Sequence, residues 1–233
     1  MEAALLTFVA ACWALLGTSA ITGLVSLVGH RSGDAGIAGA RRRDLDRAWE
    51  SYAWSKRFRF RPAIGDWPRA RAPRIQGRVG DLDLVIEAVT MRIRGSPRAC
   101  TRIWARPAVP TPARVVVASE TRLVQGPRVH DLDVVRLGDP CFDSALSVRA
   151  STAEEARRFL RPDLRRALQG LLSASYRLAL VLQKTGNGAG NGSDGDDEVS
   201  LTWLGEETRP AMLNEACAVV VRACETEAGD AYR

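Results

Sequence analysis

The sequence predicts an α+β fold, in which an antiparallel sheet is packed by helices and one N-terminal transmembrane helix precedes the domain. Three observations support this. Residues 3–28 carry no charge, strand patterns are concentrated in residues 74–148, and helical patterns are frequent from residue 151 onward. Two late strands, at 176–183 and 199–204, form a hairpin. Strands grouped first and helices later are typical of an antiparallel α+β domain.

The uncharged run at residues 3–28 predicts a membrane anchor. As a helix it is long enough to cross the ~30 Å hydrocarbon core of a bilayer. A cleavable signal peptide is the main alternative, since residues 18–20 are small enough for a cleavage site, and a buried helix is another. A signal peptide has a basic start and a shorter apolar core, whereas only Glu2 and Met1 precede this run. We therefore expect residues 1–30 to form the anchor.

The net charge of +6 comes mainly from arginine, because Lys56 and Lys184 are the only lysines among 33 basic residues. Such an excess is typical of a GC-rich bacterial genome, so single arginines are weak evidence for a ligand. The charge is also polarised, since residues 41–78 are mainly basic and residues 191–233 mainly acidic. Cations near an anionic leaflet contribute about 1 kcal/mol each. A solvated basic face without a lipid role is the alternative.

Arginines near the anchor indicate its orientation. None precedes it, whereas Arg31, Arg41, Arg42 and Arg43 follow it. This asymmetry predicts a cytoplasmic C-terminal side. We expect a single-pass protein of the bacterial inner membrane, with the membrane as a partner. Small residues in the anchor would also allow a homodimer to form through it.

The residues after the anchor are predicted to form a linker and one soluble domain. Residues 31–43 are rich in glycine, as flexible linkers are. Residues 44–226 form the α+β domain, with a flexible loop at residues 185–197 that is rich in Gly, Asn and Asp. Residues 227–233 form a tail.

The first helix of the domain is expected at residues 44–57, because Leu45, Trp49 and Tyr52 recur on one helical face. The basic and aromatic residues here would suit a helix lying on a membrane surface. The alternative is a helix packed on the domain's own sheet, with tryptophan in the core. We do not expect nucleic acid as a partner, because the bilayer competes for the same surface. The candidate lipid-surface residues are Arg41, Arg42, Arg43, Arg47, Trp54 and Arg57.

A meander of four or five strands is predicted next. Gly80 and Asp81 form a turn between strands at 74–79 and 82–94, in which apolar and polar residues alternate. Further strands are expected at 99–105, 114–119 and 134–137.

The segment at residues 138–148 predicts a turn followed by an alternating strand. Asp139 caps the turn, and Phe142 enters the core. A Ser/Thr-x-x-Glu capping box and a proline at a first helical position then predict two helices. These helices run from residue 151 through Leu160 and onward from Pro162, and a final helix is expected at residues 209–225.

The cysteines and histidines do not form a metal-binding pattern. The domain's cysteines have no CxxC spacing, and neither His30 nor His130 has a partner at ligand spacing. We therefore expect no metal site and no cofactor, and a cytoplasmic domain would keep its thiols reduced. The cysteines of the domain are Cys100, Cys141, Cys217 and Cys224.

The best candidates for catalysis are one histidine and four nearby aspartates. An imidazole and carboxylates near strand ends can hold a divalent cation or perform acid–base chemistry. Aspartates that form turns are the ordinary explanation of such a set, so we expect no enzyme. The residues are His130, Asp131, Asp133, Asp139 and Asp143.

The order of motifs resembles that of uncharacterised bacterial membrane proteins with a single anchor. The resemblance covers residues 45–225. It rests on the helix that ends in Arg-Phe-Arg-Phe, on Ile-Gln-Gly-Arg at 75–78 and on a GDxxFD motif at 138–143, with Leu146 where that pattern often has Phe. The resemblance implies an anchored architecture and no particular activity.

Taken together, these features predict a non-catalytic binding or scaffold module at the inner-membrane surface, with a protein partner or a second copy of the chain. One alternative is a metal-assisted hydrolase that uses the four aspartates at 131, 133, 139 and 143. Another is a reader of anionic lipid surfaces that uses the basic segment at 41–78.

Overall fold

The computed structural model describes residues 42–64, 72–93, 95–107, 114–119, 131–174, 177–184 and 197–228. The chain divides into two compact units, Met1–Leu45 and Asp46–Arg233. The predicted anchor, most of the linker, most of the loop at 185–197 and the end of the tail lie outside the described residues. Among those described, no helix is long and apolar enough to span a membrane.

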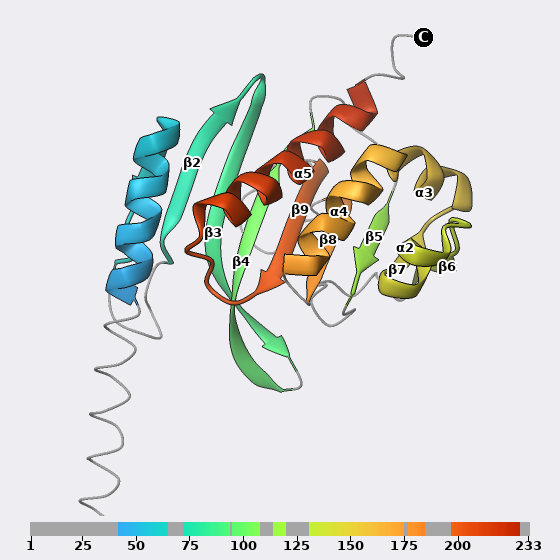
Figure 1. Cartoon of the computed structure of the whole chain (residues 1–233), viewed down its shortest axis with the longest axis horizontal. Coiled ribbons are helices and arrows are strands. Elements are labelled where there is room, and N and C mark those ends of the chain that lie inside the picture. Colours follow the sequence, from blue (N-terminus) through green and yellow to red (C-terminus); the bar gives the residue numbers. More distant parts are fainter. Residues whose placement is uncertain are drawn as a thin grey trace, which may run out of the picture. The chain divides into compact units, whose positions relative to one another are not determined.

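The second unit contains a nine-stranded antiparallel sheet, which confirms the predicted α+β class (Figure 1). Its spatial order is β1-β2-β3-β4-β9-β8-β5-β7-β6. The strands are β1 Arg59–Arg61, β2 Arg74–Val79, β3 Leu82–Ile93, β4 Ser96–Ala105, β5 Val115–Ala118, β6 Asp133–Val135, β7 Ser147–Ala150, β8 Leu178–Lys184 and β9 Asp197–Leu204.

The predicted meander is correct through β4 and wrong beyond it. After β4 the next neighbour in space is β9, and β5 lies between β8 and β7. The predicted strand in residues 138–148 is also wrong in its first part, because Pro140–Ala145 forms the short helix α2. The strand follows only at Ser147. Proline at a first helical position and a capping aspartate favour the helix over the alternating pattern.

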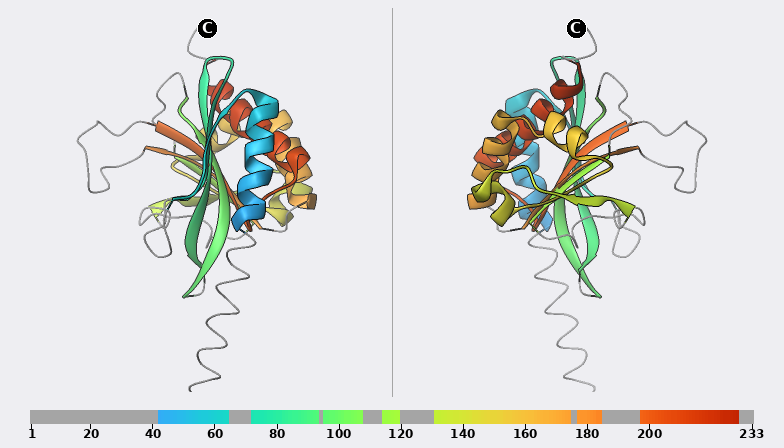
Figure 2. Two further views of the ribbon diagram at one scale, coloured as in Figure 1. Left: turned by 90° about the vertical axis from the view of Figure 1, so that its left-hand side faces the viewer. Right: turned by 90° about the vertical axis from the view of Figure 1, so that its right-hand side faces the viewer.

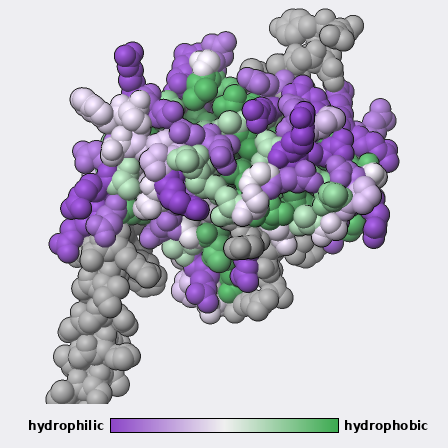
Figure 3. Space-filling view, in the orientation of Figure 1, coloured by the Kyte–Doolittle hydropathy of each residue, from purple (hydrophilic) through white to green (hydrophobic). Residues whose placement is uncertain are grey.

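Helices cover one face of this sheet, as both views of Figure 2 show. A helix begins at residue 42 in the first unit and continues to residue 56 in the second. Hydrophilic side chains cover much of the surface on the helix side, with hydrophobic residues gathered between them (Figure 3). The other helices are α2 Pro140–Ala145, α3 Ala153–Phe159, α4 Pro162–Ala174 and α5 Pro210–Ala228.

The core lies between this helix layer and the sheet. Because side chains alternate across a strand, every second residue faces the helices, and paired strands place these residues in one continuous row. Each member of the row is buried. The row contains Ile75, Ile86, Ile103, Leu201, Leu180, Val117 and Val148.

Two predicted helix starts, at Thr152 and Pro162, are confirmed, and the predicted cap at Asp139 begins a helix where a turn was predicted. The Asp139 carboxylate accepts a hydrogen bond from the backbone N–H of Phe142 at 3.1 Å, and Phe142 is fully buried. The Thr152 hydroxyl accepts one from the N–H of Glu155 at 3.1 Å. Pro162 is the first residue of α4. These local signals therefore fix where each helix begins.

The first helix packs on the domain through its apolar face. Trp49 is fully buried, and its indole N–H donates to the carbonyl oxygen of Glu207 at 2.7 Å. The Tyr52 hydroxyl donates to Asn214 of α5 at 3.1 Å. This bears out the alternative in which the helix packs on its own domain, although Trp54 is 87% exposed.

The domain's four described cysteines are free thiols, and Cys141 is the exposed one. Burial raises the pKa of Cys217 to about 11 and that of Cys224 to about 12. A thiol with so high a pKa is a poor nucleophile, because the thiolate is the reactive form. The buried cysteines therefore act as small core residues.

Candidate functional site

One face of the sheet is covered by no described helix, and we call it the open face. The strand register places Gln76, Val85 and Trp104 side by side on it, since Gln76 pairs with Val85 and Val85 pairs with Trp104. The neighbouring row on this face contains Arg74, Glu87 and Arg102, since Arg74 pairs with Glu87 and Glu87 pairs with Arg102. These side chains point away from the core because they alternate with its buried residues.

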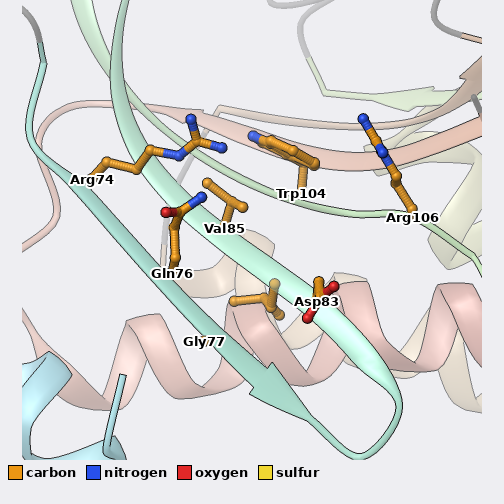
Figure 4. Close-up of a pocket in the computed structure, with 8 residues that line it drawn as sticks. Arg74, Gln76, Gly77, Asp83, Val85, Trp104 and Arg106 are labelled. Atoms are coloured by element: carbon orange, nitrogen blue, oxygen red, sulfur yellow. The ribbon is translucent and has the colours of Figure 1, made fainter. Parts of the chain in front are cut away.

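A pocket of about 430 Å³ lies on the open face where β2, β3 and β4 run side by side. Figure 4 shows Trp104 between the two arginines at the ends of the pocket, with Val85 beneath them. A volume of this size is typical of small-molecule sites. The side chains that define it are Arg74, Gln76, Asp83, Val85, Trp104 and Arg106.

Trp104 is held in place from two sides. The guanidinium of Arg74 lies over its ring, 5.5 Å from the centroid, as in a cation–π contact. Its indole N–H donates to Glu87 Oε1 at 3.1 Å. The aromatic ring is therefore fixed, and its orientation does not depend on a ligand.

Arg74 also carries an unused hydrogen-bond donor. Its Nε atom is buried and has no hydrogen-bond partner. A buried N–H without an acceptor costs free energy. Because solvent does not reach this atom, a ligand oxygen could satisfy it only after a shift of the Arg74 side chain.

The two glutamates of the open face share one cation. Arg102 donates to Glu87 Oε1 at 3.3 Å and forms an ion pair with Glu198. Glu198 is only 7% exposed, so this ion pair is largely removed from water. Arg102 therefore offsets one of the two negative charges beside Trp104.

Basic side chains surround the pocket toward the sheet edge. The register places Arg59 and Arg61 of β1 beside Gln76 and Arg74, respectively. Arg78 of β2 also lies on this face, where it pairs with Asp81 at 3.5 Å. Both members of that pair are well exposed, so the contact is weak.

Apolar side chains fill the open face further along the strands. One cluster contains Met91, Ile93, Cys100, Ala118 and Ala179. A second cluster places Leu132 against Val116 and Val181. The pocket therefore lies on the part of this face that β2, β3 and β4 form.

The comparisons with known proteins found similarity to a solved structure. Neither a protein-family model nor a curated protein matches the sequence. The chain is similar to the crystal structure of the mycobacterial trehalose monomycolate transport factor A, TtfA, with a TM-score of 0.53 and 14% sequence identity. The match covers 79% of this chain and 94% of that chain. The likeness is one of fold.

The predicted acidic set does not form a metal site in the described residues. Both Asp143 carboxylate oxygens accept backbone hydrogen bonds, from the N–H of Leu137 at 3.1 Å and of Gly138 at 3.0 Å. Asp139 caps α2 and pairs with Arg165 at 3.5 Å. The described part of the chain contains no group of three or more His, Cys, Asp or Glu that could hold a metal ion.

The remaining members of the acidic set are placed differently. Asp131 and Asp133 are exposed at the start of β6, and His130 lies outside the described residues. The two aspartates with well-defined partners, Asp139 and Asp143, are thus explained by the turn that they hold together.

The candidate lipid-surface residues fall in several places. Arg41 lies outside the described residues, and Arg42 and Arg43 belong to the first unit. In the second unit Arg47, Trp54 and Arg57 are exposed. Arg47 and Trp54 lie two turns apart on one helical face. Arg57 ends the helix with a φ of 58°, in the left-handed region.

Sequence reasoning missed the pocket. Its walls come from residues of β2, β3 and β4 that become neighbours only through the strand register. The available signal was the alternation in residues 100–105, which places Arg102 and Trp104 on one face of their strand, opposite Ile103. The same alternation in β2 places Arg74 and Gln76 together.

Proposed function

We propose that the protein is a single-pass protein of the bacterial inner membrane, and that its cytoplasmic α+β domain is a non-catalytic binding module. The open face is its binding surface, with the pocket around Trp104 at its centre. One observation carries this proposal: the pocket has a fixed aromatic ring and a guanidinium with an unused donor. Such a pre-organised arrangement favours binding, because the side chains lose little further conformational freedom when a ligand binds.

The uncharged run at residues 3–28, followed by arginines, supports attachment to the membrane. The similar solved structure belongs to a transport factor. A binding role for this chain is compatible with that fold. It also agrees with the structural use of Asp139 and Asp143, whose carboxylates bind backbone N–H groups.

Membrane attachment is tested by fractionating bacteria that express the full-length chain. We expect the protein in the membrane fraction after a carbonate wash, with its N-terminal run intact. Replacing Leu15 and Leu16 by arginine should release it, because charges at the centre of a spanning helix oppose insertion. A freely dissolved wild-type protein, or a mature form that begins near Ile21, would contradict the proposal. A reporter fused after Arg233 should be active only in the cytoplasm.

The binding surface is tested by placing a photo-crosslinking amino acid at Gln76 in the full-length protein in cells. A crosslinker at Glu215, an exposed residue of α5 on the helix side, is the matched control. We expect a discrete adduct from position 76 that is lost in a Trp104→Ala background. Equal labelling from both positions would show that the open face has no special role.

The metal-assisted hydrolase is tested by calorimetric titration of the full-length chain with Mg²⁺, Mn²⁺ and Ca²⁺. Saturable metal binding that is abolished by Asp139→Asn or Asp143→Asn would support the metal-assisted hydrolase. We expect no such heat, because the carboxylates of both residues already accept backbone hydrogen bonds.

A second candidate function is contact with an anionic lipid surface by the first helix. The observation that favours it is Trp54, which is 87% exposed and lies close in sequence to the exposed Lys56 and Arg57. Exposed tryptophan among basic residues is typical of interfacial helices. The site within the second unit is Arg47, Trp54 and Arg57.

The lipid contact is tested with a fluorophore attached to Trp54→Cys in a Cys141→Ser background, with the full-length protein in nanodiscs. Brominated lipids should quench this fluorophore in anionic discs and less so in neutral ones, and salt should reverse the effect. A fluorophore at Glu215→Cys is the control. Equal quenching in anionic and neutral discs would contradict the lipid contact.

A further inference from the structure

We infer that the pocket on the open face binds a small organic anion. The carboxylate or phosphate of this ligand pairs with Arg74, and its planar or apolar body lies against Trp104 and Val85. The inference rests on the proposed function, because it names the class of ligand for the same binding surface.

Arg74 is the anion-binding group. Its guanidinium lies over the Trp104 ring, and its buried Nε has no hydrogen-bond partner. A guanidinium stacked on a ring keeps its donors in its own plane, where a carboxylate or phosphate can accept two parallel hydrogen bonds. Figure 4 shows this guanidinium at the end of the pocket, directed toward Trp104.

The groups next to Arg74 reinforce the preference for negative charge. Gln76, the next residue of β2 on this face, adds an amide that can donate a hydrogen bond. Arg61 is the register partner of Arg74 on β1, and Arg106 lines the other end of the pocket. Positive charges gathered around one concave site attract anions.

Two acidic groups lie close by: Glu87 shares Arg102 with Glu198, and Asp83 lies away from Arg74 (Figure 4). Glu87, the register partner of Arg74 on β3, accepts hydrogen bonds from Arg102 and from the Trp104 indole. Asp83 lines the pocket away from Arg74 and pairs in register with Arg78. The end of the pocket at Arg74 is therefore cationic.

The remaining walls select the body of the ligand. Val85 is 4% exposed, so an apolar floor lies between Gln76 and Trp104. The indole offers a flat face on which a planar or apolar group can lie. A volume of about 430 Å³ accommodates a small molecule. An organic anion matches both parts of the site, whereas a bare inorganic anion matches only Arg74.

The inference is tested with the full-length chain, labelled with 5-fluorotryptophan and held in detergent micelles. The protein has six tryptophans, and the Trp104 signal is assigned from the Trp104→Phe variant. The probes are 1-naphthoate, 1-naphthyl phosphate, the neutral 1-naphthalenemethanol and inorganic phosphate. We expect both naphthyl anions to shift the Trp104 signal saturably, at least about tenfold more tightly than either of the other probes.

Substitutions then assign the contact. Arg74→Gln should weaken both naphthyl anions about tenfold while leaving the neutral probe unchanged. Arg74→Lys should restore only part of the loss, since lysine lacks the paired donors. Arg78→Gln is the matched control on the same strand and face, and it should change binding less than about twofold. The tighter of the two naphthyl anions identifies the anionic group as carboxylate or phosphate.

Three results would overturn the inference. The first is an equal loss of affinity for the naphthyl anions in Arg74→Gln and Arg78→Gln. The others are a shift of another tryptophan signal instead of that of Trp104, and no saturable shift with either naphthyl anion. The crosslinks from Gln76 separate this failure from that of the proposed function. Crosslinks that persist without anion binding would mean that the ligand class is wrong and the binding surface is correct. Absence of both the crosslinks and anion binding would mean that the open face is not a binding surface.

Discussion

Gly77 of β2 lies directly against the ring of Phe58. A Cβ added to Gly77 would overlap the Phe58 ring, so the bare backbone of the strand is what makes room for this aromatic side chain. The same glycine lies within the Ile-Gln-Gly-Arg segment, which is part of β2 itself, and the turn follows at Gly80.

Gly77→Ala should therefore lower the free energy of unfolding by about 1–3 kcal/mol, because the Phe58 ring must move from its packed position. Urea denaturation measures this. Gly170→Ala is the matched control, since its added Cβ meets nothing within 4 Å inside α4. That change should stabilise the protein by about 1 kcal/mol. Equal effects of the two substitutions would contradict the role of the Phe58 contact.

Glu207 is a buried acid whose charge stabilises the fold. Burial raises its pKa, but hydrogen bonds and the charge of Arg209 outweigh that effect, so its pKa is lowered overall. The guanidinium of Arg209 donates to both carboxylate oxygens, at 2.9 and 2.8 Å. An acid with a lowered pKa adds stability above its unfolded pKa and loses it as pH falls through the folded value.

Glu207→Gln should lower the free energy of unfolding at neutral pH by about 1–3 kcal/mol, because a charge-assisted contact is lost. It should also flatten the dependence of stability on pH below about pH 5, where the wild-type carboxylate becomes protonated. Denaturation curves over a pH series measure both effects. The exposed neighbour Glu206→Gln should reproduce neither, and an unchanged slope in Glu207→Gln would refute this account.

At the scale of single elements, α2 depends on its cap. Asp139→Ala should destabilise the protein by about 1 kcal/mol, and Asp139→Ser should recover most of that loss because serine also caps helices. Thermal unfolding measures the difference. If serine failed to restore stability while a divalent cation stabilised the wild type, Asp139 would be a ligand instead of a cap.

Elements with local signals were predictable, and pairings between distant strands were not. The cap at Thr152, Pro162 and the Gly80 turn each lie within a few residues of what they determine, and those elements were predicted correctly. No local pattern states that β5 lies between β8 and β7. The pocket also depends on strand pairing that no local pattern predicts. Gln76 and Trp104 come together only because each pairs in register with Val85.

At the scale of the whole second unit, Trp49 ties the first helix to the segment before α5 through the carbonyl oxygen of Glu207. Trp49→Phe should lower the free energy of unfolding by about 1–3 kcal/mol, since a buried acceptor loses its donor. Hydrogen exchange should speed up in both residues 46–56 and α5. The exposed Trp54→Phe should stay within about 0.5 kcal/mol of wild type. A loss of protection restricted to one helix would show that the two are not coupled.

The arrangement of the strands also bears on how the chain folds. The strands that wall the pocket follow one another in the chain, so their pairing requires the closure of short loops only. The seam between β4 and β9 instead joins Ala105 to Val199, and contacts of such sequence separation form slowly. We expect the hairpins around Trp104 to be ordered early in refolding, and the closing of this seam to set the overall rate.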